Sequence, residues 1–148
     1  NYFLAYYWVE CTHNSPFPSS AVLGGSDVDG QPIYVGRAYH DGDWIPAKIV
    51  PGRRSAYLSY AGKEICVSKY QVLCEQKFDW VPSTNGQVPP NAVIGGRTSS
   101  GENLYIGRAR HGNSLTVGKI HPSHHTCYIS FGGQEHSKKT YEVLVQRH

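Results

Sequence analysis

Ile33–His40 reads IYVGRAYH, and Leu104–His111, seventy-one positions later, reads LYIGRARH. The same spacing relates paired glycines, lysines and tyrosines along most of the chain, and only the opening pair, Trp8 and Trp80, is one residue off. A chain duplicated in this way predicts a pseudo-twofold molecule with two equivalent surface positions. Residues that differ between the two copies indicate where one copy has a task of its own.

The length of 148 residues suits one ordinary domain, whereas a copy of about 70 residues would be marginally stable unless it shared a core with the other. We therefore predict a single body over residues 1–148, with repeat 1 at about 8–74 and repeat 2 at about 80–146. The segment between them, 75–79, contains no Gly, Pro or Ser, unlike a flexible linker.

The composition bears on the compartment of the protein and on its partners. No apolar run is long enough to span a bilayer, so we expect no membrane span. Met is absent even at position 1, which favours either a mature chain after removal of a secretion signal or a trimmed chain. We expect a secreted or cell-surface protein, with the cytoplasm as the alternative. The net charge of +3 is mild and the basic residues are scattered except at Arg53-Arg54 and Lys138-Lys139, so nucleic-acid binding is not expected.

The four cysteines, Cys11, Cys66, Cys74 and Cys127, lack the CxxC spacing of a zinc ribbon or redox pair. If Cys66 and Cys74 flank a straight strand they lie too far apart to bond each other, which leaves Cys11 paired with one of them and Cys127 with the other. Four free thiols in a reducing compartment are the equal alternative.

Strand signals dominate the chain, because stretches rich in Tyr, Val and Ile alternate with Gly, Pro, Asp and Ser. Asp41-Gly42 has the chemistry of a hairpin turn, and no window has helical period with caps. The fold class is therefore all-β, with a sandwich, a barrel or two facing sheets left open. The expected strands are 33–39, 44–50, 56–60 and 69–74 in the first copy and 104–110, 115–121, 127–131 and 140–146 in the second.

A family resemblance rests on several motifs in one register. Between Trp80 and Leu144 the chain reads WV, PPNAVIGG, LYIGRA, GKI, FGGQEH and YEVL in order. This pattern resembles the DM9 repeat, and Trp8–Leu73 resembles it too, with Tyr60–Glu64 in place of the glycine-rich turn. The resemblance implies an all-β protein of two quasi-symmetric DM9 repeats of antiparallel strands. The family includes soluble invertebrate lectins that bind mannose and act as pattern-recognition proteins in innate immunity.

Sugar recognition needs a carboxylate, a hydrogen-bond donor and often an aromatic ring. Asp27 follows a Gly-Gly turn, Lys48 lies on the second strand of the hairpin, and Tyr34, Tyr39 and Trp44 are near in sequence. Taken alone, Asp27 is equally typical of a residue that caps a turn, and Lys48 of a solvent-exposed lysine on a strand.

The family resemblance carries the sugar-contacting roles of mannose-binding members onto Asp27 and Lys48. In the second copy the matching residues are Thr98 and Lys119. Thr98 lacks the charge and paired oxygens that favour a vicinal diol, so a weaker second site is expected there. Mannose or mannosylated microbial glycans are the expected partners, and a homo-oligomer would add avidity.

Other chemistry has little support in the sequence. Asp27–Gly30 resembles a fragment of a calcium loop, but the expected Glu does not follow. His121, His124 and His125 lie in a polar Pro-containing loop, where exposed histidines are commoner than a zinc site. No catalytic motif is present, so we expect neither an enzyme nor a cofactor or metal. The rival function is a protein-interaction module that uses the aromatic segment Tyr2–Trp8.

The repeated Gly-Arg pairs favour a scaffold role. Arg37 and Arg108 are expected to pair with a carboxylate such as Glu64 or Glu135 where the two halves meet.

Overall fold

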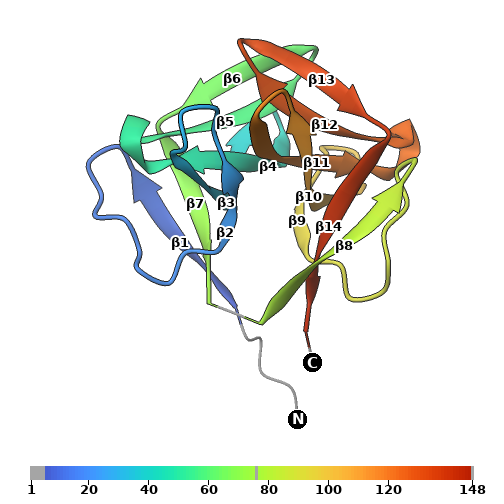
Figure 1. The fold of residues 1–148 in the computed structure, drawn as a ribbon, viewed down its shortest axis with the longest axis horizontal. Coiled ribbons are helices and arrows are strands. Elements are labelled where there is room, and N and C mark those ends of the chain that lie inside the picture. Colours follow the sequence, from blue (N-terminus) through green and yellow to red (C-terminus); the bar gives the residue numbers. More distant parts are fainter. Residues whose placement is uncertain (1–5, 76, 148) are drawn as a thin grey trace.

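The computed structural model describes residues 6–75 and 77–147, which form fourteen strands and two single 3-10 turns (Figure 1). The first repeat contributes β1 (Tyr7–Thr12), β2 (Leu23–Ser26), β3 (Pro32–His40), β4 (Asp43–Val50), η1 (Pro51–Arg53), β5 (Ser55–Tyr60), β6 (Lys63–Val67) and β7 (Lys69–Cys74). The second repeat contributes β8 (Phe78–Thr84), β9 (Ile94–Arg97), β10 (Asn103–His111), β11 (Ser114–His121), η2 (Pro122–His124), β12 (Thr126–Phe131), β13 (Gln134–Lys138) and β14 (Thr140–Gln146).

All fourteen strands belong to one antiparallel sheet, in the order β1-β7-β3-β2-β11-β12-β13-β6-β5-β4-β9-β10-β14-β8. Additional pairing of β3 with β4 and of β10 with β11 closes this sheet on itself. In Figure 1 the blue-to-green first copy and the yellow-to-red second copy lie on opposite sides, with β6 beside β13 at the top. Within the described chain, no helix is long and apolar enough to cross a membrane.

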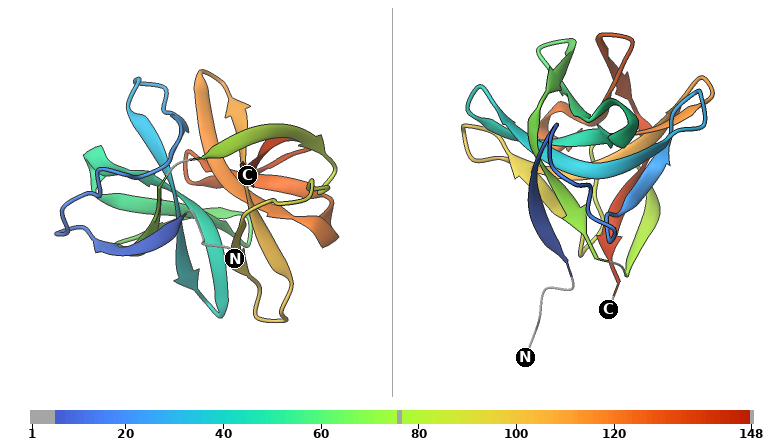
Figure 2. Two further views of the ribbon diagram at one scale, coloured as in Figure 1. Left: turned by 90° about the horizontal axis from the view of Figure 1, so that it is seen from below. Right: turned by 90° about the vertical axis from the view of Figure 1, so that its left-hand side faces the viewer.

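Each repeat lends a short strand to the other. β2 pairs with β11 at Ser26 and Leu115, and β9 pairs with β4 at Arg97 and Trp44. The view from below in Figure 2 shows the two copies reaching toward each other across an approximate twofold axis.

Glycine makes this exchange possible. A Cβ at Gly25 would collide with the carbonyl oxygen of Leu115, and one at Gly96 would collide with that of Trp44. Only a residue without a side chain lets the two backbones approach so closely. The repeated Gly-Gly pairs are therefore the points at which the two copies interlock.

The central core is shared between the repeats. One buried apolar cluster joins Ile33, Val35 and Leu73 of the first copy to Ile106 and Leu144 of the second. Two flanking clusters lie mainly within the first and the second copy, respectively. The alternation of buried and exposed residues along β3 and β10 is the same, so equivalent positions supply equivalent core residues.

The all-β prediction is confirmed, and each of the eight expected strands is present with its ends moved by no more than one residue. Strands β1, β2, β6, β8, β9 and β13 were not anticipated. The predicted disulfides are not formed: all four cysteines are free, with Cys66 exposed and the other three buried. Cys127 lies in the core of the second copy, so the free-thiol alternative describes the structure.

Candidate functional site

Two lysines are buried at equivalent positions of the two copies. Lys48 on β4 is 3% exposed, and its Nζ lies 3.3 Å from Glu64 Oε2. The same ammonium donates to the carbonyl oxygen of Ser130 in the other copy (2.7 Å). The rings of Tyr57 and Phe131 lie 5.7 and 5.5 Å from Nζ. The charge is thus compensated by one carboxylate, one carbonyl and two aromatic faces.

Lys119 on β11 repeats this arrangement with a looser fit. It is 6% exposed, its Nζ lies 3.8 Å from Glu135 Oε2, and the rings of Tyr60 and Tyr128 lie 5.8 and 5.5 Å away. Burial lowers the pKa of Lys119, although Glu135 and Asp43 oppose that shift. The second lysine is therefore the less well compensated of the two.

The two glutamates tie the copies together. Glu64 Oε1 accepts the N–H of Gly133, and Glu135 Oε1 accepts the N–H of Gly62, each at 3.0 Å. These carboxylates do lie where the halves meet, as expected, but they face lysines. The predicted pairing with Arg37 or Arg108 was wrong, because those guanidinium groups turn toward other partners.

Each of these arginines lies over a tryptophan ring. The guanidinium carbon of Arg37 is 4.0 Å from the centre of the Trp8 ring, and that of Arg108 is 4.2 Å from the Trp80 ring. Arg37 donates from Nε to Gln71 (2.7 Å), and Arg108 donates from Nε to Glu142 (2.8 Å). The predicted scaffold role fits these contacts, which fasten the outer strands of each repeat.

Asp27 lies in the turn between β2 and β3 and is 5% exposed. Its Oδ1 accepts the N–H of Val28 (2.9 Å), and its backbone closes the turn through Gln31 and Gly30. Its Oδ2 lies 3.1 Å from Arg53 Nη2, but that contact is not aligned as a hydrogen bond, and no other described donor reaches this buried oxygen. The carboxylate therefore keeps unused accepting capacity.

A row of side chains connects Asp27 with Lys48, although no hydrogen bond or ion pair between described residues joins the two directly. The Arg53 guanidinium carbon lies 5.8 Å from the centre of the Tyr57 ring, and Lys48 Nζ lies 5.7 Å from the same ring. Arg53 is half exposed, at 49% of its side chain. Carboxylate, guanidinium, phenol and ammonium thus follow one another in space.

Sequence reasoning missed Arg53 and Tyr57 as members of this row. The recurrence of Tyr57 as Tyr128 was a usable signal, since an aromatic residue opposite each lysine is kept in both copies. The Arg53-Arg54 pair stood out only as a local basic pair, and nothing in the sequence tied Arg53 to Asp27, which its side chain reaches because η1 bends the chain after β4. The rings first considered lie elsewhere: Tyr34 packs on Phe17, and Tyr39 on Trp44.

In the second copy the equivalent row has different chemistry. Thr98 Oγ1 is engaged within its own turn by the N–H of Glu102 (3.1 Å) and by Ser100 Oγ (3.0 Å). Glu102 also binds His121 Nε2 (3.0 Å) and accepts two hydrogen bonds from Ser123.

His124 takes the position that Arg53 has in the first copy. Its ring stacks on His121 with centres 3.5 Å apart, and its Nδ1 hydrogen-bonds the Tyr128 hydroxyl (2.9 Å). No group of three or more His, Cys, Asp or Glu side chains in residues 6–75 and 77–147 is arranged to hold a metal ion. In the second row Thr98, Glu102 and His124 are thus engaged with one another's turn, with His121 and with Tyr128.

Comparison with known proteins agrees with the architecture. Residues 27–138 match the family model of the DM9 repeat. Natterin-4 of Thalassophryne nattereri is 29% identical over 135 residues, which cover 88% of this chain and 32% of natterin-4. Natterin-1 of the same species is 35% identical over 68 residues, 46% of this chain and 17% of natterin-1. The chain thus spans about a third or less of the length of these curated relatives.

A solved structure shares the fold. The nematode sperm cell motility protein MFP2B superposes with a TM-score of 0.65 over 97% of this chain and 46% of that chain, at 15% identity. At this identity the likeness extends to the fold alone.

Proposed function

Because this chain belongs to the DM9 repeat family, we propose that it is a carbohydrate-binding lectin for mannose or mannose-containing glycans. Its role would be pattern recognition on microbial surfaces in innate immunity. The primary site is the row that runs from Asp27 to Lys48. The matching row with Thr98 and Lys119 is the weaker second site.

The observation that carries this proposal is the unmet accepting capacity of Asp27. A buried carboxylate oxygen without a well-aligned donor is costly, and neighbouring hydroxyls of a sugar are donors of the right kind. The nearest charged group, Arg53, is half exposed and able to swing outward. A ligand hydroxyl then replaces or shares the position of the guanidinium at Asp27 Oδ2.

The rest of the row supplies what a sugar ring needs. An ammonium group has three N–H donors, and Lys48 uses two of them toward Ser130 and Glu64, so the third is left for a sugar hydroxyl. The Tyr57 ring, between Arg53 and Lys48, offers an apolar face to the C–H surface of the pyranose. Binding needs no metal in this scheme.

The second row supports weaker binding for a physical reason. The Thr98 hydroxyl is taken up within its own turn, and His124 is held by Tyr128 and stacked on His121. A sugar would have to break these contacts before it could form its own. The first site therefore dominates for a single chain.

The test is a glycan array followed by calorimetry on the intact chain, with Asp27→Asn as the isosteric variant. Loss of a charged hydrogen bond of about 1.5–3 kcal/mol corresponds to a loss of mannose affinity of about tenfold or more. Asp29→Asn is the matched control, since Asp29 belongs to the same turn, is exposed, and accepts the backbone N–H of Gln31 at Oδ1, a bond that the Asn side-chain oxygen can keep. It should bind like the unmutated chain, and chelator should have no effect.

A blank array for the unmutated chain would end the proposal and favour the rival, a protein-interaction module using the aromatic segment Tyr2–Trp8. The first four residues of that segment lie outside the described residues. Tyr7 is half exposed and Trp8 is covered by Arg37. Turnover of a labelled sugar would instead point to an enzyme.

A further inference from the structure

The two copies differ in the length of one loop. The loop that joins β1 to the bridge residue Ala21 is one residue longer than the loop that joins β8 to Ala92. Thr12 and Thr84 occupy equivalent places at the strand ends, so the extra residue lies beyond Thr12. This accounts for the one-residue slip of the first tryptophan pair.

In the second copy the shorter loop is fastened down. The carbonyl oxygen of Gln87 accepts hydrogen bonds from the hydroxyls of Ser83 and Tyr141, both at 2.8 Å. Gly86 packs against the backbone of His125 so closely that a Cβ would lie 2.7 Å from its Cα. The loop therefore closes onto η2 and leaves no room between them.

In the described part of the first copy, the counterparts of these two hydrogen bonds are absent. Cys11 stands where the second copy has Ser83, so the corresponding hydroxyl is missing. Tyr70, the counterpart of Tyr141, is 4% exposed, and its hydroxyl bonds to no described residue. Because its ring is held at the position equivalent to Tyr141, that hydroxyl points toward the longer loop.

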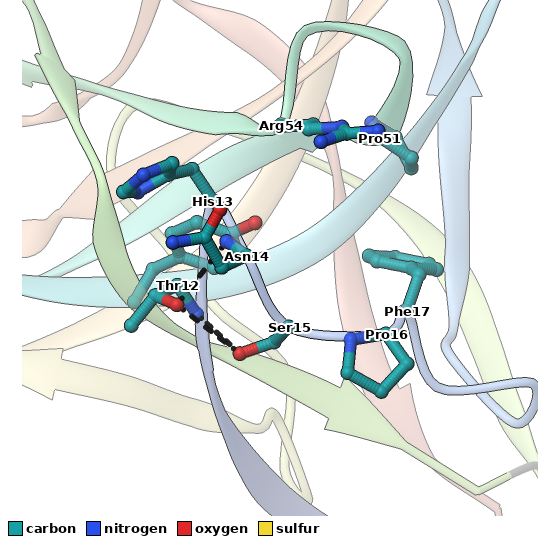
Figure 3. Close-up of a pocket in the computed structure, with 9 residues that line it drawn as sticks. Thr12, His13, Asn14, Ser15, Pro16, Phe17, Pro51 and Arg54 are labelled. Carbon is teal, nitrogen blue, oxygen red and sulfur yellow. Dashed lines mark hydrogen bonds between the residues drawn. The ribbon is translucent and has the colours of Figure 1, made fainter.

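A hollow of about 440 Å³ opens between this loop and η1, and Tyr70 is part of its wall. Figure 3 shows Arg54 and Pro51 along one side, His13 and Asn14 on another, and the Phe17 ring facing them across the opening. The volume lies within the range of small-molecule sites, about 300–1,000 Å³.

The wall is rich in donors and poor in negative charge. Arg54 brings a guanidinium group, Asn14 an amide, and Tyr70 a hydroxyl that no described residue hydrogen-bonds, whereas no Asp or Glu is among the described residues of this wall. Phe17 adds an apolar ring. Such a surface suits a ligand with an anionic group for the arginine and a C–H face for the ring.

We propose that this hollow is a second binding site, present only in the first copy, for a sugar ring that carries a carboxylate or a sulfate. Arg54 pairs with the anionic group, Phe17 covers one face of the ring, and Tyr70 and Asn14 bind hydroxyls. The site does not use Asp27. Consecutive arginines of one turn thus serve two sites, Arg53 toward Asp27 and Arg54 toward the hollow.

The test titrates the full chain with methyl glucuronide, glucose 6-sulfate, methyl glucoside and inorganic sulfate, by amide NMR and calorimetry. The two acidic sugars should shift the amides of residues 12–17 and Arg54, and should bind about tenfold more tightly than the neutral glucoside or sulfate alone. Whichever acidic sugar binds more tightly identifies the source of the charge. Equal binding of acidic and neutral sugars, or of sulfate alone, would overturn the proposal.

Matched variants assign the residues. Arg54→Ala should weaken binding of the acidic sugar about tenfold, and Tyr70→Phe should weaken it severalfold. Their counterparts His125→Ala and Tyr141→Phe should leave it unchanged, as should Asp27→Asn, which separates this site from the mannose site. Amide spectra of each variant report whether the fold is kept. Full binding by folded Arg54→Ala would refute the assignment.

Discussion

Lys48 of the first repeat donates a hydrogen bond of 2.7 Å to the carbonyl oxygen of Ser130 in the second repeat. Replacing Lys48 by Met leaves that carbonyl and the Glu64 carboxylate without their cation. Removal of one partner of a buried pair costs about 3–5 kcal/mol, and we expect a loss near 3 kcal/mol because Glu64 keeps the N–H of Gly133.

Lys119→Met is the matched control for this change. Its ammonium lies farther from its carboxylate, at 3.8 Å, so less attraction offsets the cost of burying the charge, which lowers the pKa of Lys119. Its loss should therefore be smaller, about 1–2 kcal/mol. Urea unfolding of both variants measures the difference, and equal losses would contradict this account of the asymmetry.

Alanine at Gly25 or Gly96 should destabilise the protein by about 3 kcal/mol or more, because the new Cβ forces apart β2 and β11 or β9 and β4. Gly52→Ala is the control, since its Cβ would meet only the flexible Gln31 side chain at 3.3 Å. Thermal unfolding should place the first two variants well below the third. Similar melting temperatures for all three would refute the interlock.

Lowering the pH should destabilise the fold through His121. Burial and the neighbouring His124 and Lys119 lower the pKa of His121, while Glu102 works in the opposite direction. The unfolded chain, in which the pKa of histidine is about 6.5, then binds the proton at a higher pH than the folded chain does. The free energy of unfolding therefore decreases as the pH falls through about 6.5 and below.

Val50 is the equivalent of His121 in the first copy, so His121→Val introduces a residue type that this position accepts. The variant should make the free energy of unfolding less dependent on pH between about 7.5 and about 5. Urea midpoints at several pH values measure this slope. His125→Asn removes a histidine from the adjacent exposed turn as a control. A slope unchanged in His121→Val would show that the destabilisation arises elsewhere.

The thiols should react in two classes. Cys66 is exposed, whereas burial raises the pKa of Cys11 and Cys74 and raises that of Cys127 to about 12. A thiol reagent near neutral pH should label one cysteine of the native chain and all four after denaturation. Cys66→Ser should abolish the native reaction. Rapid native labelling at more than one position would contradict the burial.

Much of the fold was predictable because it is local. The β3–β4 hairpin follows from alternating apolar residues around Asp41-Gly42, and the repeat gives its counterpart β10–β11 at the same place. The short strands β2 and β9 were not predictable in this way. They are four residues long and exist because a strand of the other copy passes beside them, which no local pattern records.

In the candidate site, too, some residues could be identified from the sequence and others only from the tertiary structure. The resemblance singled out Asp27 and Lys48, which the structure places at the two ends of one row. Their immediate partners come from distant sequence, since Arg53, at the end of η1, reaches back to Asp27 and Ser130 comes from the other repeat. Pair contacts of this kind depend on tertiary packing and leave no trace in spacing or composition.

The pairing of β2 and β9 with strands of the opposite repeat has a consequence for biosynthesis. When the first repeat has left the ribosome, β2 pairs only with β3, and the start of β4 at Trp44 pairs only with β3, until β9 and β11 have been made. The nascent amino-terminal half must therefore wait, with unpaired backbone groups that another nascent copy could capture. Fast translation of the second half protects such a chain from assembling with the wrong molecule.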